Sequence, residues 1–488
     1  MLQKLDHILA SLSGFTPEVW LVVAFVGIIT WDLIAPEAHA ESRGGFFHGL
    51  TFLAFAFLGV LLVQQWQIQP RGVLFGSMLR LDDRAIFFKL LVTLTALITV
   101  LHSWVTGRRW SGEFFSVLIG TVFGLLVLSM ATNLLMVYLS LEVVSISSYI
   151  LTALRGDRKS SEGGMKYVLF GSVASALMLY GMSLLYGLTS TLDFTNPSFS
   201  RALLETDPLV SASAILLAIS GLLFKVSAVP FQVWNPDVYE AADTPVVSFF
   251  SVAPKAVAFL VLMRLFSVLP LNFQPVLAVL SLATITVGNF SALWQTEAKR
   301  LMAYSSIAQS GFVLVGLVAF SELGQQTATF YLGSYVFASM ACFLLIDILS
   351  TSRSKNEVPI QSFSGVGRQQ PLPAILLSIA FISLVGLPLT VGFSAKLLIF
   401  SSLWEAYQHT NASLFLILFV FGLLNTAVSL AFYVKIPYAL FFKTAEPGQS
   451  LVSPRWPQVI LALVLVIPII VLFLRTDWLM NWIAGFVS

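Results

Sequence analysis

Apolar segments separated by short polar loops recur along the whole chain. One of the clearest runs from Val459 to Leu474 without a charged residue. A helix needs about 20 such residues to cross the hydrocarbon layer of a membrane. Of the 488 residues, 57% are hydrophobic and 10% are charged, whereas soluble domains carry about 25% charged residues. The sequence therefore predicts an all-α polytopic membrane protein.

The apolar segments predict about fourteen transmembrane helices. Their approximate ranges are 17–35, 47–66, 85–103, 113–131, 133–153, 165–189, 209–231, 245–269, 272–295, 300–320, 325–350, 372–405, 411–442 and 457–486. The first sixteen residues lack a basic region followed by a cleavage site, so we expect the first helix to be retained.

Basic residues are distributed unevenly among the predicted loops. Those after odd-numbered helices contain Arg108, Arg109, Arg155, Arg158, Lys159, Lys299, Arg300, Arg353, Lys355, Arg368, Lys443 and Arg455. Those after even-numbered helices contain mainly Arg71, Arg80, Arg84 and Arg201. Because loops rich in Lys and Arg stay in the cytoplasm, we expect an even number of helices and both termini on the non-cytoplasmic side.

Two of the predicted helices contain helix-breaking residues. In the seventh, Lys225 is followed by Pro230, and in the twelfth, Gly386 and Pro388 precede Lys396. Backbone groups freed by such breaks need buried surroundings or water. Paired interrupted segments in corresponding positions indicate an inverted repeat. We therefore expect three N-terminal helices (1–112), two inverted five-helix repeats (113–270 and 271–444) and a final helix (445–488).

Four charged residues lie deep within predicted helices. Glu142 and Lys255 lie near the middle of their segments, and Lys225 and Lys396 lie beside the breaks. A charge at the centre of a span costs about 2.5–3.5 kcal/mol on insertion scales. Because an apolar environment disfavours the ammonium form, a buried lysine is suited to taking up and releasing protons.

Structural explanations exist for the same residues. Glu142 and Lys225 could form a static ion pair that fixes helix packing, and Lys396 could reach the membrane surface. A structural role is harder to defend for Lys255, whose segment 245–269 contains no acidic residue. Charged residues nearer helix ends are expected to reach the interface or cap a helix, namely Lys89, Arg264, Asp347 and Lys435.

Several classes of site are not expected. The single cysteine, Cys342, excludes a disulfide or thiolate metal cluster within the chain. The five histidines include no pair four residues apart, so neither a haem nor a metal site is expected. No phosphate-binding loop or nucleotide fingerprint occurs, and a net charge of +2 does not indicate a nucleic-acid partner.

The combination of these residues resembles the antiporter-like subunits of respiratory complex I and of multisubunit cation/proton antiporters. The segments that carry the resemblance are 138–142 (YLSLE), 224–225 (FK), 229–234 (VPFQVW), 253–256 (APKA), 299–307 (KRLMAYSSI), 386–388 (GLP) and 392–396 (GFSAK). Within the family, the chain is most similar to the type with lysine in both the eighth and twelfth helices. It lacks the long lateral helix that follows in the L type.

The resemblance implies a role for each buried charge. Glu142 and Lys225 would be the coupling ion pair, Lys255 the central proton carrier and Lys396 the terminal carrier. Lys299, at a helix start, corresponds more weakly to a carrier. Many relatives have histidine where this chain has Gln309; since an amide does not titrate, a relay there would use water or be absent.

The resemblance also implies function and partners. The expected function is proton translocation within the membrane arm of NADH:quinone oxidoreductase, in the bacterial inner membrane. FMN, iron–sulfur clusters and quinone would belong to other subunits, with no cofactor or metal on this chain. Expected partners are lipid, protons and other hydrophobic subunits, including antiporter-like homologues. The alternatives are a subunit of a cation/proton antiporter, which glutamate in place of Lys396 would favour, and a non-transporting scaffold.

Overall fold

The computed structural model describes residues 9, 11–34, 40–68, 71–350, 358–444 and 453–487. The basic residues Arg353 and Lys355 lie outside these ranges. Within them, eleven helices are long and apolar enough to cross a membrane, or twelve if one bent pair counts as a single span. The chain is therefore a multi-span membrane protein, as the apolar segments predicted.

The chain divides into two compact units. The first comprises Met1–Val226 and Ala253–Phe273, and the second comprises Ser227–Val252 and Gln274–Ser488. The second half of helix α12 (Thr244–Phe266) belongs to the first unit and its first half to the second.

The first unit consists mainly of helices. Its other elements are α2 (Thr16–Ile34), α3 (Ala40–Ile68), β1 (Gly72–Leu74), β2 (Leu79–Leu81), α4 (Asp83–Val105), α5 (Gly112–Met130), α6 (Leu134–Ala153), α7 (Arg158–Thr189), α8 (Pro197–Glu205), α9 (Pro208–Ala218), α10 (Ser220–Val226) and η2 (Leu271–Phe273). The antiparallel hairpin β1–β2, in which Val73 pairs with Arg80, joins α3 to α4. The all-α prediction had omitted this hairpin.

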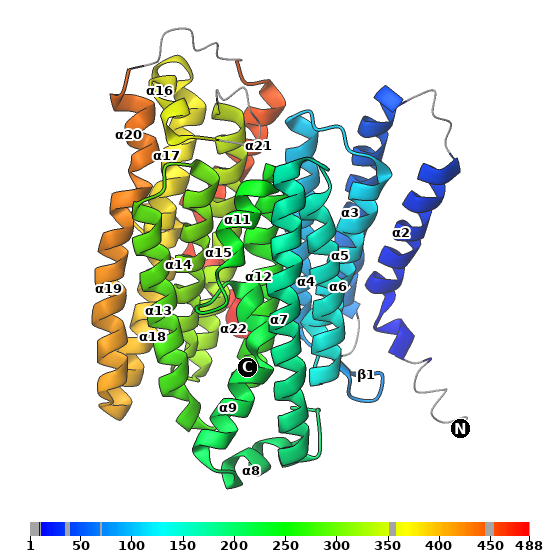
Figure 1. The fold of residues 1–488 in the computed structure, drawn as a ribbon, viewed down its shortest axis with the longest axis vertical. Coiled ribbons are helices and arrows are strands. Elements are labelled where there is room, and N and C mark those ends of the chain that lie inside the picture. The colour runs from blue at the N-terminus through cyan, green and yellow to red at the C-terminus, as the bar shows by residue number, and fades with distance from the viewer. Residues whose placement is uncertain are drawn as a thin grey trace. The chain divides into compact units, whose positions relative to one another are not determined.

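The second unit, which includes the first half of α12, also consists mainly of helices. Its elements are α11 (Trp234–Ala241), α13 (Gln274–Leu293), α14 (Ala298–Leu317), α15 (Glu322–Leu349), η3 (Ile360–Phe363), α16 (Val366–Gln369), α17 (Pro371–Val385), α18 (Val391–Thr410), α19 (Ser413–Tyr433), α20 (Lys435–Phe442), α21 (Trp456–Leu474) and α22 (Thr476–Val487). Helices α13, α14, α18 and α19 run side by side (Figure 1).

Both predicted helix breaks are present. Helices α9 and α10 are bent by 51°, and α10 ends at Val226, before the non-helical stretch 227–233. Helix α17 ends at Val385 and is followed by Gly386, whose φ of +86° is readily adopted only by glycine, and α18 begins at Val391. Lys225 and Lys396 thus lie beside interruptions of the helical backbone.

Candidate functional site

Glu142 and Lys225 lie close together in the first unit, but not in direct contact. Lys225 on α10 is buried, and its Nζ donates to Ser145 Oγ on α6 at 3.3 Å and to Tyr167 Oη on α7 at 3.5 Å. The Glu142 carboxylate accepts from Ser175. Among the described residues, Glu142 and Lys225 form no direct ion pair. Hydroxyl groups surround both charges, and Ser145 lies one turn beyond Glu142 on α6.

Lys255 lies in the middle of α12. It is buried and directly follows Pro254, which lies inside the helix. Because proline has no N–H, Pro254 does not donate a helical hydrogen bond to the carbonyl of Phe250. At the end of the same helix, Arg264 donates to both carboxylate oxygens of Asp82, at 2.7 and 2.8 Å.

Lys396 is held by the break between α17 and α18. Its Nζ donates to the backbone carbonyls of Val385 at 2.7 Å and Leu384 at 3.3 Å. It also lies 4.3 Å from the centre of the Phe312 ring on α14, a cation–π contact. The interruption of the helix therefore supplies the acceptors that a buried ammonium group needs. A cavity of about 770 Å³ adjoins this lysine.

Gln309 on α14 lies at the centre of a hydrogen-bonded cluster. Its Oε1 accepts from the hydroxyl of Tyr331 on α15. Its Nε2 donates to the hydroxyl of Tyr433 on α19 and to the carbonyl of Leu384, both at 2.9 Å. Tyr433 in turn shares a hydrogen bond with Ser305. The Leu384 carbonyl is thus common to Gln309 and Lys396.

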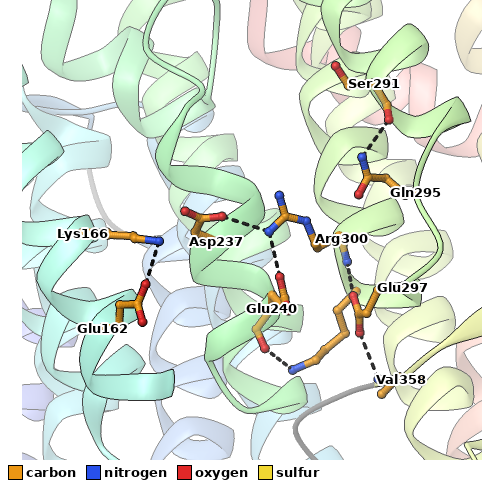
Figure 2. A network of polar contacts seen from close by, with 10 residues as sticks. Glu162, Lys166, Asp237, Glu240, Ser291, Gln295, Glu297, Arg300 and Val358 are labelled. Atoms are coloured by element: carbon orange, nitrogen blue, oxygen red, sulfur yellow. Dashed lines mark hydrogen bonds and ion pairs between the residues drawn. The ribbon is translucent and has the colours of Figure 1, made fainter. Parts of the chain in front are cut away.

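Lys299 and Arg300 hold the end of α11, and Figure 2 shows Arg300 beside Asp237 and Glu240. Lys299 donates to the carbonyls of Glu240 and Ala242 at 2.9 and 3.0 Å, and Arg300 pairs with Asp237 and Glu240. A lysine at a helix C-terminus satisfies carbonyls that have no helical partner. Lys299 is buried near the start of α14 and thus binds backbone carbonyls at the end of α11.

Glu297 precedes α14 in the same cluster. Its two carboxylate oxygens accept from the backbone N–H groups of Arg300 at 2.6 Å and Val358 at 3.1 Å. Burial raises the pKa of Glu297, and the charge of Lys299 and these donors oppose the rise. The carboxylate therefore ties the start of α14 to the segment that follows α15.

The sequence and structure of the chain match known proteins over most of its length. The family described as NADH:quinone oxidoreductase/Mrp antiporter, transmembrane, matches residues 131–422. NADH-quinone oxidoreductase subunit N 2 of Chloroherpeton thalassium is 37% identical over 456 residues, covering 90% of this chain and 87% of the relative. The chain belongs to the subunit N family of NADH-quinone oxidoreductases. Subunit N 1 of Solibacter usitatus is 36% identical and covers 92% of both chains.

Solved structures agree with this assignment. A chain of respiratory complex I from Thermus thermophilus with bound aureothin has a TM-score of 0.80 and 29% identity, covering 95% of this chain and 98% of that one. A chain of the Mrp complex from Dietzia sp. has a TM-score of 0.82 at 18% identity, which shows that the antiporter-like fold is shared. The resemblance read from the sequence is therefore confirmed at the level of family.

The first unit contains a buried ion pair that was not predicted from the sequence. The Nζ of Lys89 on α4 lies 2.7 Å from Glu18 Oε1 on α2, and both side chains are completely inaccessible to solvent. The prediction that Lys89 reaches the interface is wrong, because Glu18 provides a partner inside the protein. Glu18 lies near the start of the first apolar segment, so its position resembled that of an ordinary helix-start carboxylate.

Two other basic residues expected at the interface also bind protein groups. Arg264 pairs with Asp82. Lys435 donates to the backbone carbonyls of Leu293 and Gln295. Apolarity and position along a helix reveal how deep a charge lies, but not which partner a distant helix brings to it.

Proposed function

We propose that this chain is a proton-translocating subunit of the membrane arm of NADH:quinone oxidoreductase, driven by redox chemistry in other subunits. The observation that carries the proposal is the setting of Lys396. Its buried ammonium group is held by two carbonyl oxygens and an aromatic ring. A lysine with neutral partners can lose its proton without leaving a carboxylate uncompensated in the interior.

Each buried charge has a proposed role. Glu142 and Lys225 form the coupling element, and Lys255 and Lys396 are the central and terminal carriers. A rearrangement in a neighbouring subunit would move Glu142 away from Lys225. The less compensated charge of Lys225 would then disfavour the charged form of Lys255 and promote release of its proton. Lys299 positions the end of α11 through the carbonyls that it binds.

The proposed topology has fourteen crossings with both termini outside the cytoplasm, and inverted repeats formed by helices 4–8 and 9–13. Up to twelve of these crossings are helices in the described part of the chain that are apolar by composition. Helix α14 and the pair α17–α18 would supply the remaining crossings. Nearly every residue of α14 is buried, Arg300 and Tyr304 excepted. Protein therefore covers its polar residues, which makes a polar crossing possible in lipid.

The proposed partners are the other hydrophobic subunits of the complex, including antiporter-like homologues, together with membrane lipid in the bacterial inner membrane. FMN, iron–sulfur clusters and quinone would be bound by other subunits. No group of three or more potential metal ligands occurs in the part of the chain that the structure describes. This chain would contribute proton transfer and no redox step.

Lys255→Arg tests the proposed function. Arginine keeps the charge but does not release a proton at physiological pH, so the complex should assemble while proton uptake falls. Quinone reduction should fall with it, because the two processes are coupled. The measurement is NADH-driven quinone reduction and proton uptake in membrane vesicles, with subunit content checked by immunoblot.

Lys435→Arg is the matched control, since Lys435 donates to the carbonyls of Leu293 and Gln295 at the end of α13. It should leave both rates unchanged. Normal pumping by a fully assembled Lys255→Arg complex would exclude the carrier role and favour the scaffold alternative. Dependence of transport on sodium or potassium would favour the cation/proton antiporter alternative.

A further inference from the structure

The hydrogen bonds of Gln309 define the orientation of its amide. The Leu384 carbonyl is an acceptor only, so the side-chain atom that faces it must be the NH₂ group. The other atom is then the oxygen, which accepts from Tyr331. The second N–H points to Tyr433, whose hydroxyl oxygen accepts it and can donate to Ser305. The chain of donors therefore runs in one direction, from Tyr331 through Gln309 to Tyr433 and Ser305.

An amide in this position fixes its neighbours but does not carry a proton. Both amide hydrogens and the oxygen are engaged, and the group is neutral throughout the physiological pH range. Phenol hydroxyls can both donate and accept. The groups of the cluster that can both donate and accept a proton are therefore the hydroxyls of Tyr331 and Tyr433, and the Gln309 amide fixes the position of both.

The same amide acts on Lys396 through a shared atom. The Leu384 carbonyl accepts from Gln309 at 2.9 Å and from Lys396 at 3.3 Å. Phe312, one turn after Gln309 on the same face of α14, lies against the Lys396 ammonium group. One face of α14 therefore contacts Lys396 directly through the ring and indirectly through the amide.

We propose that Gln309 is a positioning residue that orients the Leu384 carbonyl for the ammonium group of Lys396 and aligns the hydroxyls of Tyr331 and Tyr433 beside it. The inference rests on the proposed function and extends it. The titratable groups that face this cluster are Tyr331, Tyr335 and Cys342 from α15, Tyr433 from α19 and Lys396 from α18. Gln309 sets the position at which Lys396 binds and releases its proton.

Gln309→Leu tests the proposal. The variant should lower the rate of NADH-driven proton uptake roughly fivefold, which is the rate equivalent of one ordinary hydrogen bond. It should also shift the pH profile. Without the amide, the Leu384 carbonyl is no longer held toward the ammonium group, so the charged form of Lys396 is less well stabilised and the alkaline limb moves to lower pH. A role in packing alone would lower the amount of complex without moving this limb.

Tyr433→Phe provides a second test, since it removes one hydroxyl and keeps the ring. It should shift the alkaline limb of the pH profile in the same direction as Gln309→Leu. The effects of the two variants should not add, because the two residues share one interaction. Tyr239→Phe is the matched control. It removes a buried phenol that bonds Ser306 instead of Gln309 and should leave the limb in place.

Two results would overturn the proposal. One is an unchanged rate and pH limb in both Gln309→Leu and Tyr433→Phe; if the leucine variant does not assemble, Tyr433→Phe alone decides. The other is faster pumping by Gln309→His than by the natural protein, since residue 309 would then limit the rate as a carrier. Lys396→Met distinguishes a failure of this proposal from a failure of the proposed function. If the assembled Lys396→Met complex pumps protons normally, the proposed function itself is wrong.

Discussion

Buried lysines in this chain have different kinds of partner. Lys89 contacts the carboxylate of Glu18, Lys225 donates to hydroxyls and Lys396 donates to backbone carbonyls. A lysine in a contact ion pair is held in its charged form, because deprotonation would leave the carboxylate alone in the interior. Lysines with neutral partners are not constrained in this way. This difference is consistent with a structural role for Lys89 and with the proposed protonic role of Lys396.

Lys89→Met should leave Glu18 buried without a cation. Removing one member of a buried pair costs about 3–5 kcal/mol, whereas replacing both by apolar residues of similar size is often neutral. We expect Lys89→Met to reduce the amount of assembled complex and the double variant Glu18→Leu/Lys89→Met to restore it. Immunoblots of membranes and thermal unfolding of the purified complex measure both effects. Loss of proton uptake by an assembled double variant would contradict a purely structural role.

At the scale of elements, the break between α17 and α18 creates the Lys396 site. Gly386 ends α17 with a positive φ, and a Cβ added there would lie 2.8 Å from Cδ of Lys396. The backbone turn and the lysine therefore occupy adjoining space. A side chain at residue 386 would disturb both the conformation of the break and the position of the ammonium group.

Gly386→Ala should accordingly impair pumping. A left-handed conformation costs a non-glycine residue roughly 1–2 kcal/mol, and displacement of Lys396 should slow proton uptake further. The control is Gly59→Ala in α3, where an added Cβ meets no atom within 4 Å and alanine favours the helix. The two variants are compared by proton uptake per assembled complex. Equal rates would show that the break tolerates a side chain and does not position Lys396.

Apolar segments and breaks could be predicted from the sequence, but some element boundaries could not. Helix α7 begins at Arg158 rather than near residue 165, because Asp157 caps a polar first turn that an apolar pattern does not register. The short α8 has polar and apolar faces and lacks the length of a span. The hairpin β1–β2 turns at Phe75, Gly76 and Ser77, which all have positive φ, but its strands of 3 residues each are too short to show an alternating pattern.

The buried charges of the candidate site could be predicted from the sequence, but their partners could not. A charge within an apolar segment is visible in the sequence, so Glu142, Lys225, Lys255 and Lys396 could be selected. The contacts of Lys225 with Ser145 and Tyr167 depend on packing between distant segments. Such packing has no local signature.

At the scale of the whole molecule, the proposed orientation in the membrane rests on charge. Basic residues cluster in the loops after the predicted odd-numbered helices, and by the positive-inside rule we expect those loops in the cytoplasm. Ser161 lies near the start of α7 and Ser198 lies in α8, beyond the end of α7. Both are exposed. Since one predicted crossing separates them, they should face opposite sides of the membrane.

The natural protein is well suited to a labelling test of this topology. Its single cysteine, Cys342, is completely buried, so background labelling should be low. With a membrane-impermeant maleimide, Ser161→Cys should react only from the cytoplasmic side and Ser198→Cys only from the opposite side. Epitope tags at the two termini should both be accessible from the non-cytoplasmic side, because an even number of crossings returns the chain to the side on which it began. Detection of the two tags on opposite sides would contradict fourteen crossings, and reversed reactivity of the two cysteines would contradict the assigned orientation.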